Sequence, residues 1–152
     1  MNRVYFVLFA VGLCLSTPGY AHSHTKDKML VTDPGQYHAL LTAHLSKEGN
    51  ELDIFFETAD KVAAPVALMT GGFTLRAVLN RGKAQELNFT CAPAEERPAG
   101  EKAGTCSHFV AKAPWMKRSD NLKVDGTVTA SGFDFKVAWR NFVPERYAHH
   151  VE

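Results

Sequence analysis

The sequence predicts an all-β protein, an immunoglobulin-like antiparallel β-sandwich of about seven strands. Apolar and polar residues alternate in several short runs, which is the period of a half-buried strand. Residues that favour turns separate these runs at intervals of roughly ten residues. No stretch keeps a helical period long enough to form a substantial helix. These three observations favour a sandwich over any helical fold.

The N-terminal half supplies the first predicted strands. Residues 29–31 form a short apolar run, and we expect this run to pair as an edge strand of a sheet. Residues 37–45 and 51–58 alternate over their whole length, and the polar turn at 47–50 joins them as a hairpin. Residues 59–72 contain a proline and adjacent glycines, so they are predicted to be a connection.

The hairpin also has a predicted register. Folding the chain about the turn places Leu45 opposite Leu52 and His44 opposite Asp53. A slip of one residue would move the apolar side chains to the wrong face, so the register is constrained.

The C-terminal half continues the alternation. Arg81-Gly82-Lys83 and Ser131-Gly132 are predicted turns, Gly126 is predicted to mark a bulge or bend, and Pro144 ends the last strand. Trp139 and several phenylalanines would fill the space between the sheets. The predicted strands are residues 73–80, 84–91, 106–112, 122–130 and a final strand that begins at residue 133.

The first 21 residues have the pattern of a signal peptide. Arg3 precedes an apolar run, residues 4–15, that is too short to span a bilayer of ~30 Å. Small residues in Gly19-Tyr20-Ala21 predict cleavage after Ala21. The prediction is therefore a signal peptide at 1–21 and one mature domain at 22–152, periplasmic or secreted, with no membrane insertion after cleavage.

Composition excludes several classes of function. Seventeen Lys and Arg residues balance sixteen Asp and Glu residues, which argues against nucleic acid or an anionic membrane as a partner. The chain contains no Gly-x-Ser-x-Gly elbow, no phosphate-binding glycine loop and no HExxH motif. We therefore do not expect an enzyme.

Two cysteines of the predicted mature chain favour a disulfide. In an oxidising compartment Cys91 and Cys106 are expected to pair. The segment between them is rich in Pro, Gly and charge, and closing such a loop contributes roughly 3 kcal/mol in the chain-entropy model. A metal site from these cysteines and His108 is the alternative, but it lacks the paired CxxC spacing of such sites.

The predicted mature terminus, His22-Ser23-His24, has the pattern of a metal chelator. A free terminal amine, two amide nitrogens and the His24 imidazole can form a square-planar nitrogen set, which Cu(II) and Ni(II) favour. His22 adds a second imidazole. The alternative is an ordinary polar tail, and it applies if cleavage falls elsewhere.

Three further histidines are candidate supplementary metal ligands. His149 and His150 lie near the other end of the sequence, where adjacent side chains of an extended segment point in opposite directions. His44 is predicted to face Asp53, and a carboxylate that orients a metal-bound histidine is chemically reasonable. The alternatives are a solvated tail for the first two and a hydrogen-bonded surface pair for His44.

Export, an N-terminal histidine and a small sandwich together resemble the periplasmic copper-resistance proteins of the C type. That resemblance implies an immunoglobulin-like fold that binds Cu(II) through its N-terminal histidine, carried over here to His22 alone. The Asp-x-His motif and Met-rich loop of that family are absent. Residues 109–115 and 147–150 also resemble segments of uncharacterised secreted bacterial proteins, which implies no function.

The leading functional hypothesis is a periplasmic metal-binding protein that handles copper and serves a metal-efflux or tolerance system. Its partner would be an efflux protein or another periplasmic protein. The alternative hypothesis is a metal-free β-sandwich that binds another protein through a sheet edge or face.

Overall fold

The computed structural model describes residues 26–80 and 82–151. The predicted signal peptide and cleavage site, together with His22 and His24, therefore lie outside the described residues. Nine strands and two short 3-10 turns make up the described elements. The turns are η1 (Lys26–Lys28) and η2 (Ala94–Glu96). The strands are β1 (Leu30–Thr32), β2 (Tyr37–Leu45), β3 (Glu51–Thr58), β4 (Gly72–Leu79), β5 (Ala84–Cys91), β6 (His108–Lys112), β7 (Leu122–Ala130), β8 (Phe133–Phe142) and β9 (Ala148–Val151).

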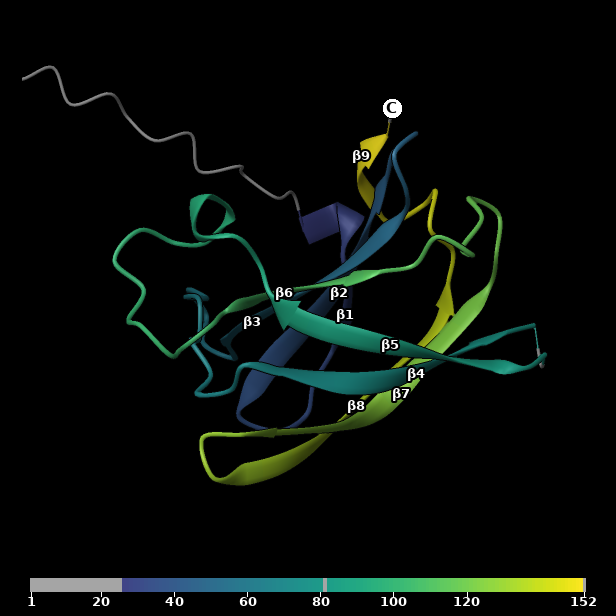
Figure 1. Ribbon diagram of the computed structural model, residues 1–152. Coiled ribbons are helices and arrows are strands. Elements are labelled where there is room, and N and C mark those ends of the chain that lie inside the picture. Colours follow the sequence, from purple (N-terminus) through teal and green to yellow (C-terminus); the bar gives the residue numbers. More distant parts are fainter. Residues whose placement is uncertain (1–25, 81, 152) are drawn as a thin grey trace, which may run out of the picture.

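All nine strands belong to one sheet, in which the main path runs β1-β2-β3-β6-β5-β4-β7-β8. Its pairs are antiparallel, and β1 and β8, at the two ends of the path, contact each other. The sheet thus curls into a nearly closed, barrel-like sandwich (Figure 1). The predicted all-β antiparallel sandwich is confirmed. The short strand β9 lies off this path and pairs with β2 in parallel.

Apolar side chains that alternate along the strands form the core. Its centre is aromatic, because Phe56 lies 5.8–6.2 Å from the rings of Phe73, Phe109 and Phe135. Trp139 is 1% exposed and belongs to the same core. Edge-to-face packing of such rings stabilises the core beyond the area that it buries.

The predicted hairpin has the expected strands but not the expected register. His44 pairs with Glu51, and Asp53 pairs with Thr42. The predicted His44–Asp53 pair is therefore wrong. A shift of two residues leaves every side chain on its expected face, since side chains alternate with period two.

The position of the turn explains the shift. Ser46 and Gly49 close the turn, because Gly49 N donates to Ser46 O and Ser46 Oγ donates to Gly49 O. The predicted turn lay one residue further along the chain. Leu52 consequently pairs with Ala43, and the expected Leu45–Leu52 pair is also wrong.

Gly126 lies in a regular rung of β7, not in a bulge. It pairs with Val137, and the irregularity of β7 lies between Leu122 and Val124. A Cβ on Gly126 would lie 2.7 Å from Leu75 Cδ2 on β4. The glycine therefore allows a close approach of side chain and backbone.

The segment between β5 and β6, residues 92–107, is called the cover loop below. A disulfide between Cys91 and Cys106 holds its two ends together, with a Cα–Cα distance of 5.8 Å. The predicted disulfide is confirmed. Within the described residues, no helix has the length and hydrophobicity needed to cross a membrane.

Candidate functional site

The outer face of β2, β3 and β6, opposite the core, is covered. Four of its side chains are almost fully buried, although they point away from the core: Leu40, Thr42, Asp53 and His108. Residues 94–99 of the cover loop and Met29, which precedes β1, lie over this face. The cover loop thus adds a partial layer outside the sandwich.

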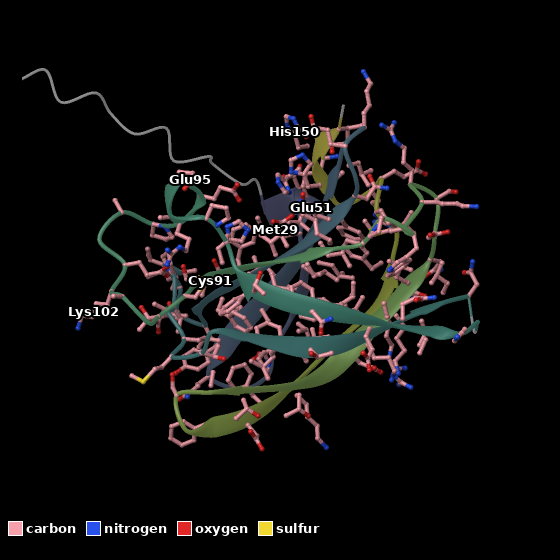
Figure 2. All side chains as sticks on the ribbon, in the orientation of Figure 1. Met29, Glu51, Cys91, Glu95, Lys102 and His150 are labelled. Atoms are coloured by element: carbon pink, nitrogen blue, oxygen red, sulfur yellow. A yellow bond between two sulfur atoms is a disulfide. The ribbon has the colours of Figure 1, made fainter. Side chains whose placement is uncertain are left out.

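A cavity of about 910 Å³ lies between the cover and the sheet. Figure 2 shows Met29, Glu51 and His150 gathered at one end of the molecule, with Glu95 on the cover loop nearby. The charged and histidine side chains that line the cavity are Glu51, Asp53, Glu57, Glu95, Glu96, Arg97, His44, His108, His149 and His150.

Acidic residues dominate the charge of this cavity. Five lining residues are Asp or Glu, and Arg97 is the single Lys or Arg among them. Glu51 also forms an ion pair with Lys112, so part of the acidic charge is neutralised locally. A concave surface of one predominant sign raises the local concentration of oppositely charged ligands, which here are cations.

A buried hydrogen-bond chain joins the sheet to the cover loop. His108 Nε2 lies 2.9 Å from Asp53 Oδ1, and His108 Nδ1 lies 3.2 Å from the Glu96 carbonyl oxygen. The ring also stacks on Phe55, with centroids 4.1 Å apart. A carbonyl oxygen only accepts, so Nδ1 carries a proton. Both ring nitrogens are thus occupied, and His108 orients the loop instead of ligating a metal.

Asp53 retains an unused acceptor at this cavity. The residue is 4% exposed, and within the described part of the chain its Oδ2 has no hydrogen-bond partner. A buried carboxylate oxygen without a partner is unfavourable. A cationic or hydrogen-bond-donating ligand in the cavity would relieve that cost.

Three histidines meet where β9 pairs with β2. The ring centroid of His44 lies 5.7 Å from that of His149 and 5.0 Å from that of His150. Thr42 Oγ1 donates to the Tyr147 carbonyl oxygen at 2.5 Å and lies 3.2 Å from His149 Nδ1. The parallel pairing thus places these imidazoles, which are far apart in the sequence, at one end of the cavity.

An irregularity in the pairing explains how adjacent histidines reach the same neighbour. Ala43 pairs with Ala148, whereas His44 pairs with His150, so the register shifts at His149. Such a bulge redirects a side chain that regular alternation would turn away. The sequence alone gave no signal for this bulge.

The three imidazoles do not form a ready-made coordination set. Among the described residues, only Cys91, Glu101 and Cys106 form a group of three or more potential ligand atoms lying within 4.8 Å of one another. Metal binding by His44, His149 and His150 would therefore require their rings to turn. His150 is exposed and His44 is half-buried, which leaves room for such rotation.

The structure thus brings together three of the five predicted metal ligands. His44, His149 and His150 form one cluster, here called the histidine cluster, while His22 and His24 lie outside the described residues. The Asp53–His108 pair was missed, because it depends on β3 lying beside β6, and nothing in the local sequence indicates that pairing.

No family model, curated protein or solved structure matches this chain. The resemblance to copper-resistance proteins therefore stays an expectation, and the geometry of the described residues carries the functional argument.

Proposed function

We propose that this protein binds a late first-row divalent metal ion, copper(II) first, through the histidine cluster. The observation that carries the proposal is the parallel pairing of β9 with β2, which places His149 and His150 beside His44. Imidazole nitrogen is a ligand that copper, nickel and zinc all favour, and copper(II) binds most tightly in the general affinity order.

The surroundings of the cluster support a cationic ligand. The same cavity carries five acidic residues and the unpaired Oδ2 of Asp53. Carboxylates close to a metal site stabilise its charge and orient its imidazole ligands. The cavity is therefore better suited to a metal cation than to an anion.

The N-terminal histidines would supply further ligands to the same end of the molecule. Met29 lines the cavity, and His24 precedes it by five residues in the sequence. If cleavage follows Ala21, the amine of His22 and the imidazole of His24 would either add ligands to a metal ion held by the histidine cluster or compete with the cluster for that ion.

The cellular role that we propose is copper handling in the periplasm, in service of efflux or tolerance. The Cys91–Cys106 disulfide supports folding in an oxidising compartment. The cavity is partly open to solvent, which would allow transfer of the ion to a partner protein.

Isothermal titration of the exported, untagged protein with Cu(II) tests the proposal. We expect one saturable tight site, weakened by at least about tenfold in His44→Ala and in His150→Ala. His38→Ala is the matched control, because His38 lies on the same strand and face but does not line the cavity. It should leave the affinity unchanged.

Two outcomes would contradict this assignment. Loss of the site in His24→Ala, with no effect of His44→Ala, would confine binding to the N-terminal residues. Absence of saturable binding beyond that of a generic histidine-containing peptide would instead favour the metal-free interaction module.

A further inference from the structure

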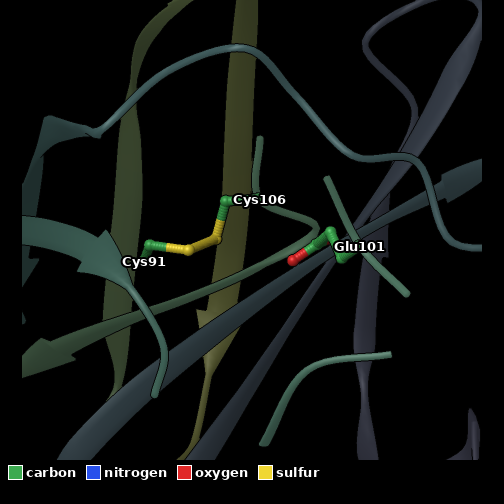
Figure 3. A group of neighbouring side chains, drawn as sticks. All are labelled: Cys91, Glu101 and Cys106. Carbon is green, nitrogen blue, oxygen red and sulfur yellow. A yellow bond between two sulfur atoms is a disulfide. The ribbon is translucent and has the colours of Figure 1, made fainter. Parts of the chain in front are cut away.

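A buried carboxylate lies against the disulfide. The Sγ atoms of Cys91 and Cys106 and a carboxylate oxygen of Glu101 all lie within 4.8 Å of one another. Figure 3 shows the Glu101 carboxylate directed toward the disulfide. Cys91 ends β5, and Glu101 and Cys106 belong to the cover loop. The arrangement is separate from the histidine cluster, and neither cysteine lines the cavity.

Glu101 has one satisfied and one unsatisfied oxygen. Its Oε2 accepts from Arg97 Nη1 at 3.0 Å, and its side chain is only 6% exposed. Within the described residues, Oε1 is buried and has no hydrogen-bond partner. An apolar disulfide offers this oxygen no donor, so the oxidised protein leaves its acceptor capacity unused at a cost.

Reduction would change the chemistry of this group. A dithiol reductant would attack the disulfide, take the oxidised disulfide form itself, and leave two thiols on Cys91 and Cys106. Metal binding would then release both thiol protons and create two thiolates. Two sulfurs and one carboxylate oxygen are a ligand set that Zn²⁺ uses, with water in a fourth position.

We propose that the reduced protein holds a zinc ion between Cys91, Cys106 and Glu101, so that the disulfide and the metal site are alternative states of the same residues. The backbone positions suit both states, because two sulfurs on one tetrahedral zinc lie roughly 3.8 Å apart. The sulfurs must move apart from their bonded separation, and rotation of the two short side chains can supply this while the Cα atoms, 5.8 Å apart, stay close enough for both to reach one ion.

The local charges also suit a divalent ion. Two thiolates and the Glu101 carboxylate carry three negative charges, and Arg97 contributes one positive charge. A zinc ion brings the group to neutrality, which a buried cluster requires. The carboxylate oxygen favours zinc over Cu(I), since Cu(I) selects soft sulfur ligands.

Cobalt(II) substitution provides the test. The exported protein is reduced with dithiothreitol, freed of reductant under argon, and titrated with Co²⁺ and then Zn²⁺. We expect a near-ultraviolet thiolate-to-cobalt band that saturates at one equivalent and is displaced by Zn²⁺. The oxidised protein should show no such band. Imidazole ligands give no thiolate band, so the result is independent of the histidine cluster.

Variants assign the third ligand. Glu101→Gln should weaken zinc binding to the reduced protein by at least about tenfold. Removing a residue that only hydrogen-bonds to a metal ligand already lowers the metal affinity by this factor, and removing a ligand itself should lower it at least as much. Glu95→Gln, in the same loop but exposed, should leave it unchanged. Circular dichroism of the reduced protein, with and without Zn²⁺, shows whether the binding form is folded.

Three results would overturn the proposal. One is a reduced, folded protein without a thiolate band. Another is a band of undiminished affinity in Glu101→Gln. The third is a reduced protein that loses its β-sheet spectrum and does not regain it with Zn²⁺.

Discussion

His108 is the residue on which the cover of the outer face depends. Its imidazole contacts Asp53 on β3 in a buried pair, and it contacts the Glu96 carbonyl oxygen on the cover loop in a part-buried one. We expect His108→Ala to lower the free energy of unfolding by about 3 kcal/mol, because it leaves the buried Asp53 charge without its partner. Urea denaturation at neutral pH measures the change.

His38→Ala is the control for that prediction. His38 Nδ1 lies 3.7 Å from Glu57 Oε1, and its side chain is 30% exposed. An ion pair of this kind contributes little, so the substitution should change the free energy of unfolding by less than about 1 kcal/mol. Equal losses in the two variants would show that burial of the Asp53–His108 pair has no special importance.

Asp125 provides a prediction with a defined sign in pH. Partial burial raises its pKa, but hydrogen bonds and charge from Lys123 and Arg76 outweigh burial and hold the pKa below its ordinary value. A lowered pKa in the folded state stabilises the protein above the unfolded pKa, and this contribution is lost as pH falls through the folded pKa.

The corresponding variant is Asp125→Asn. We expect it to lower the free energy of unfolding at pH 7 by at most about 1 kcal/mol, since the group is near the surface. The difference from the parent protein should shrink toward zero in acid below the folded pKa. A difference that grows in acid would contradict the assignment. Urea denaturation across this pH range tests both statements.

At the candidate site, the sequence indicates which residues carry suitable chemistry but not which of them lie together. His44 is a candidate ligand because of its predicted Asp53 partner, and His149 and His150 are candidates because of their position near the end of the sequence. The fold brings their rings together, and metal binding by them stays a prediction. Asp53 was assigned to His44, but its actual partner is His108 on a strand more than fifty residues away. Residue type indicates chemistry, whereas partners depend on non-local strand pairing.

The short strand β9 positions two of the proposed ligands. Thr42 Oγ1 donates to the Tyr147 carbonyl oxygen and contacts His149, so it fixes the start of this strand. We expect Thr42→Val, which keeps the shape of the side chain, to weaken Cu(II) binding by about tenfold. Titration calorimetry measures the effect.

Thr129→Val is a matched control for Thr42→Val. Thr129 Oγ1 also donates to an oxygen, Asp134 Oδ1, but it lies on β7 at an exposed position. This variant should bind Cu(II) as the parent does. A tenfold loss in both variants would indicate a general effect of valine substitution and not a positioning role for Thr42.

The cover loop depends on its disulfide. We expect the double variant Cys91→Ser, Cys106→Ser to lose roughly 3 kcal/mol of unfolding free energy. Hydrogen exchange should accelerate in residues 92–105 and stay slow in β7 and β8, which pair with each other along most of their length. Uniform acceleration across all strands would show that the disulfide stabilises the whole sheet and not the loop in particular.

Strand positions were largely predictable, because each long strand carries its own alternation. The bounds of β3 and β5 match the predicted ranges, and β2 does as well. β9 was not predicted, since its four residues include two adjacent histidines and show no alternation. The hairpin register was missed by two residues, because several polar residues could form the turn and the sequence does not select among them.

At the scale of the molecule, metal binding should stabilise the fold. A ligand that binds only the folded state at about one hundred times its Kd adds about 2.7 kcal/mol to the free energy of unfolding. We therefore expect Cu(II) to raise the melting temperature at neutral pH. The increase should disappear in acid, because protonated imidazoles cannot ligate the ion. Calorimetric melting with and without Cu(II) at both pH values measures this.

Two comparisons make that result specific. At the same Cu(II) concentration, His44→Ala should show a clearly smaller increase in melting temperature than the parent, because its weaker binding adds less to the free energy of unfolding, while His38→Ala should respond as the parent does. An increase that persists undiminished in acid would be incompatible with imidazole ligands.

The class of fold was accessible from the sequence, but the order of its strands was not. Alternation indicates that a segment is a half-buried strand, but it does not indicate which other strands pair with that segment. The β3–β6 and β4–β7 pairs join segments that are distant in the chain, and they form only because they close the sheet around the aromatic core. The outer cavity depends in addition on the cover loop, which lies over one face of this sheet.

The placement of β9 has a practical consequence for making the protein. Residues fused after Glu152 would follow closely on Val151, which pairs with Leu45, the chain neighbour of His44. A polyhistidine purification tag at that position would add imidazoles to the native ones, and the tag itself would bind copper. Recombinant material should therefore be purified without such a tag, or with one that is removed completely before any copper is added.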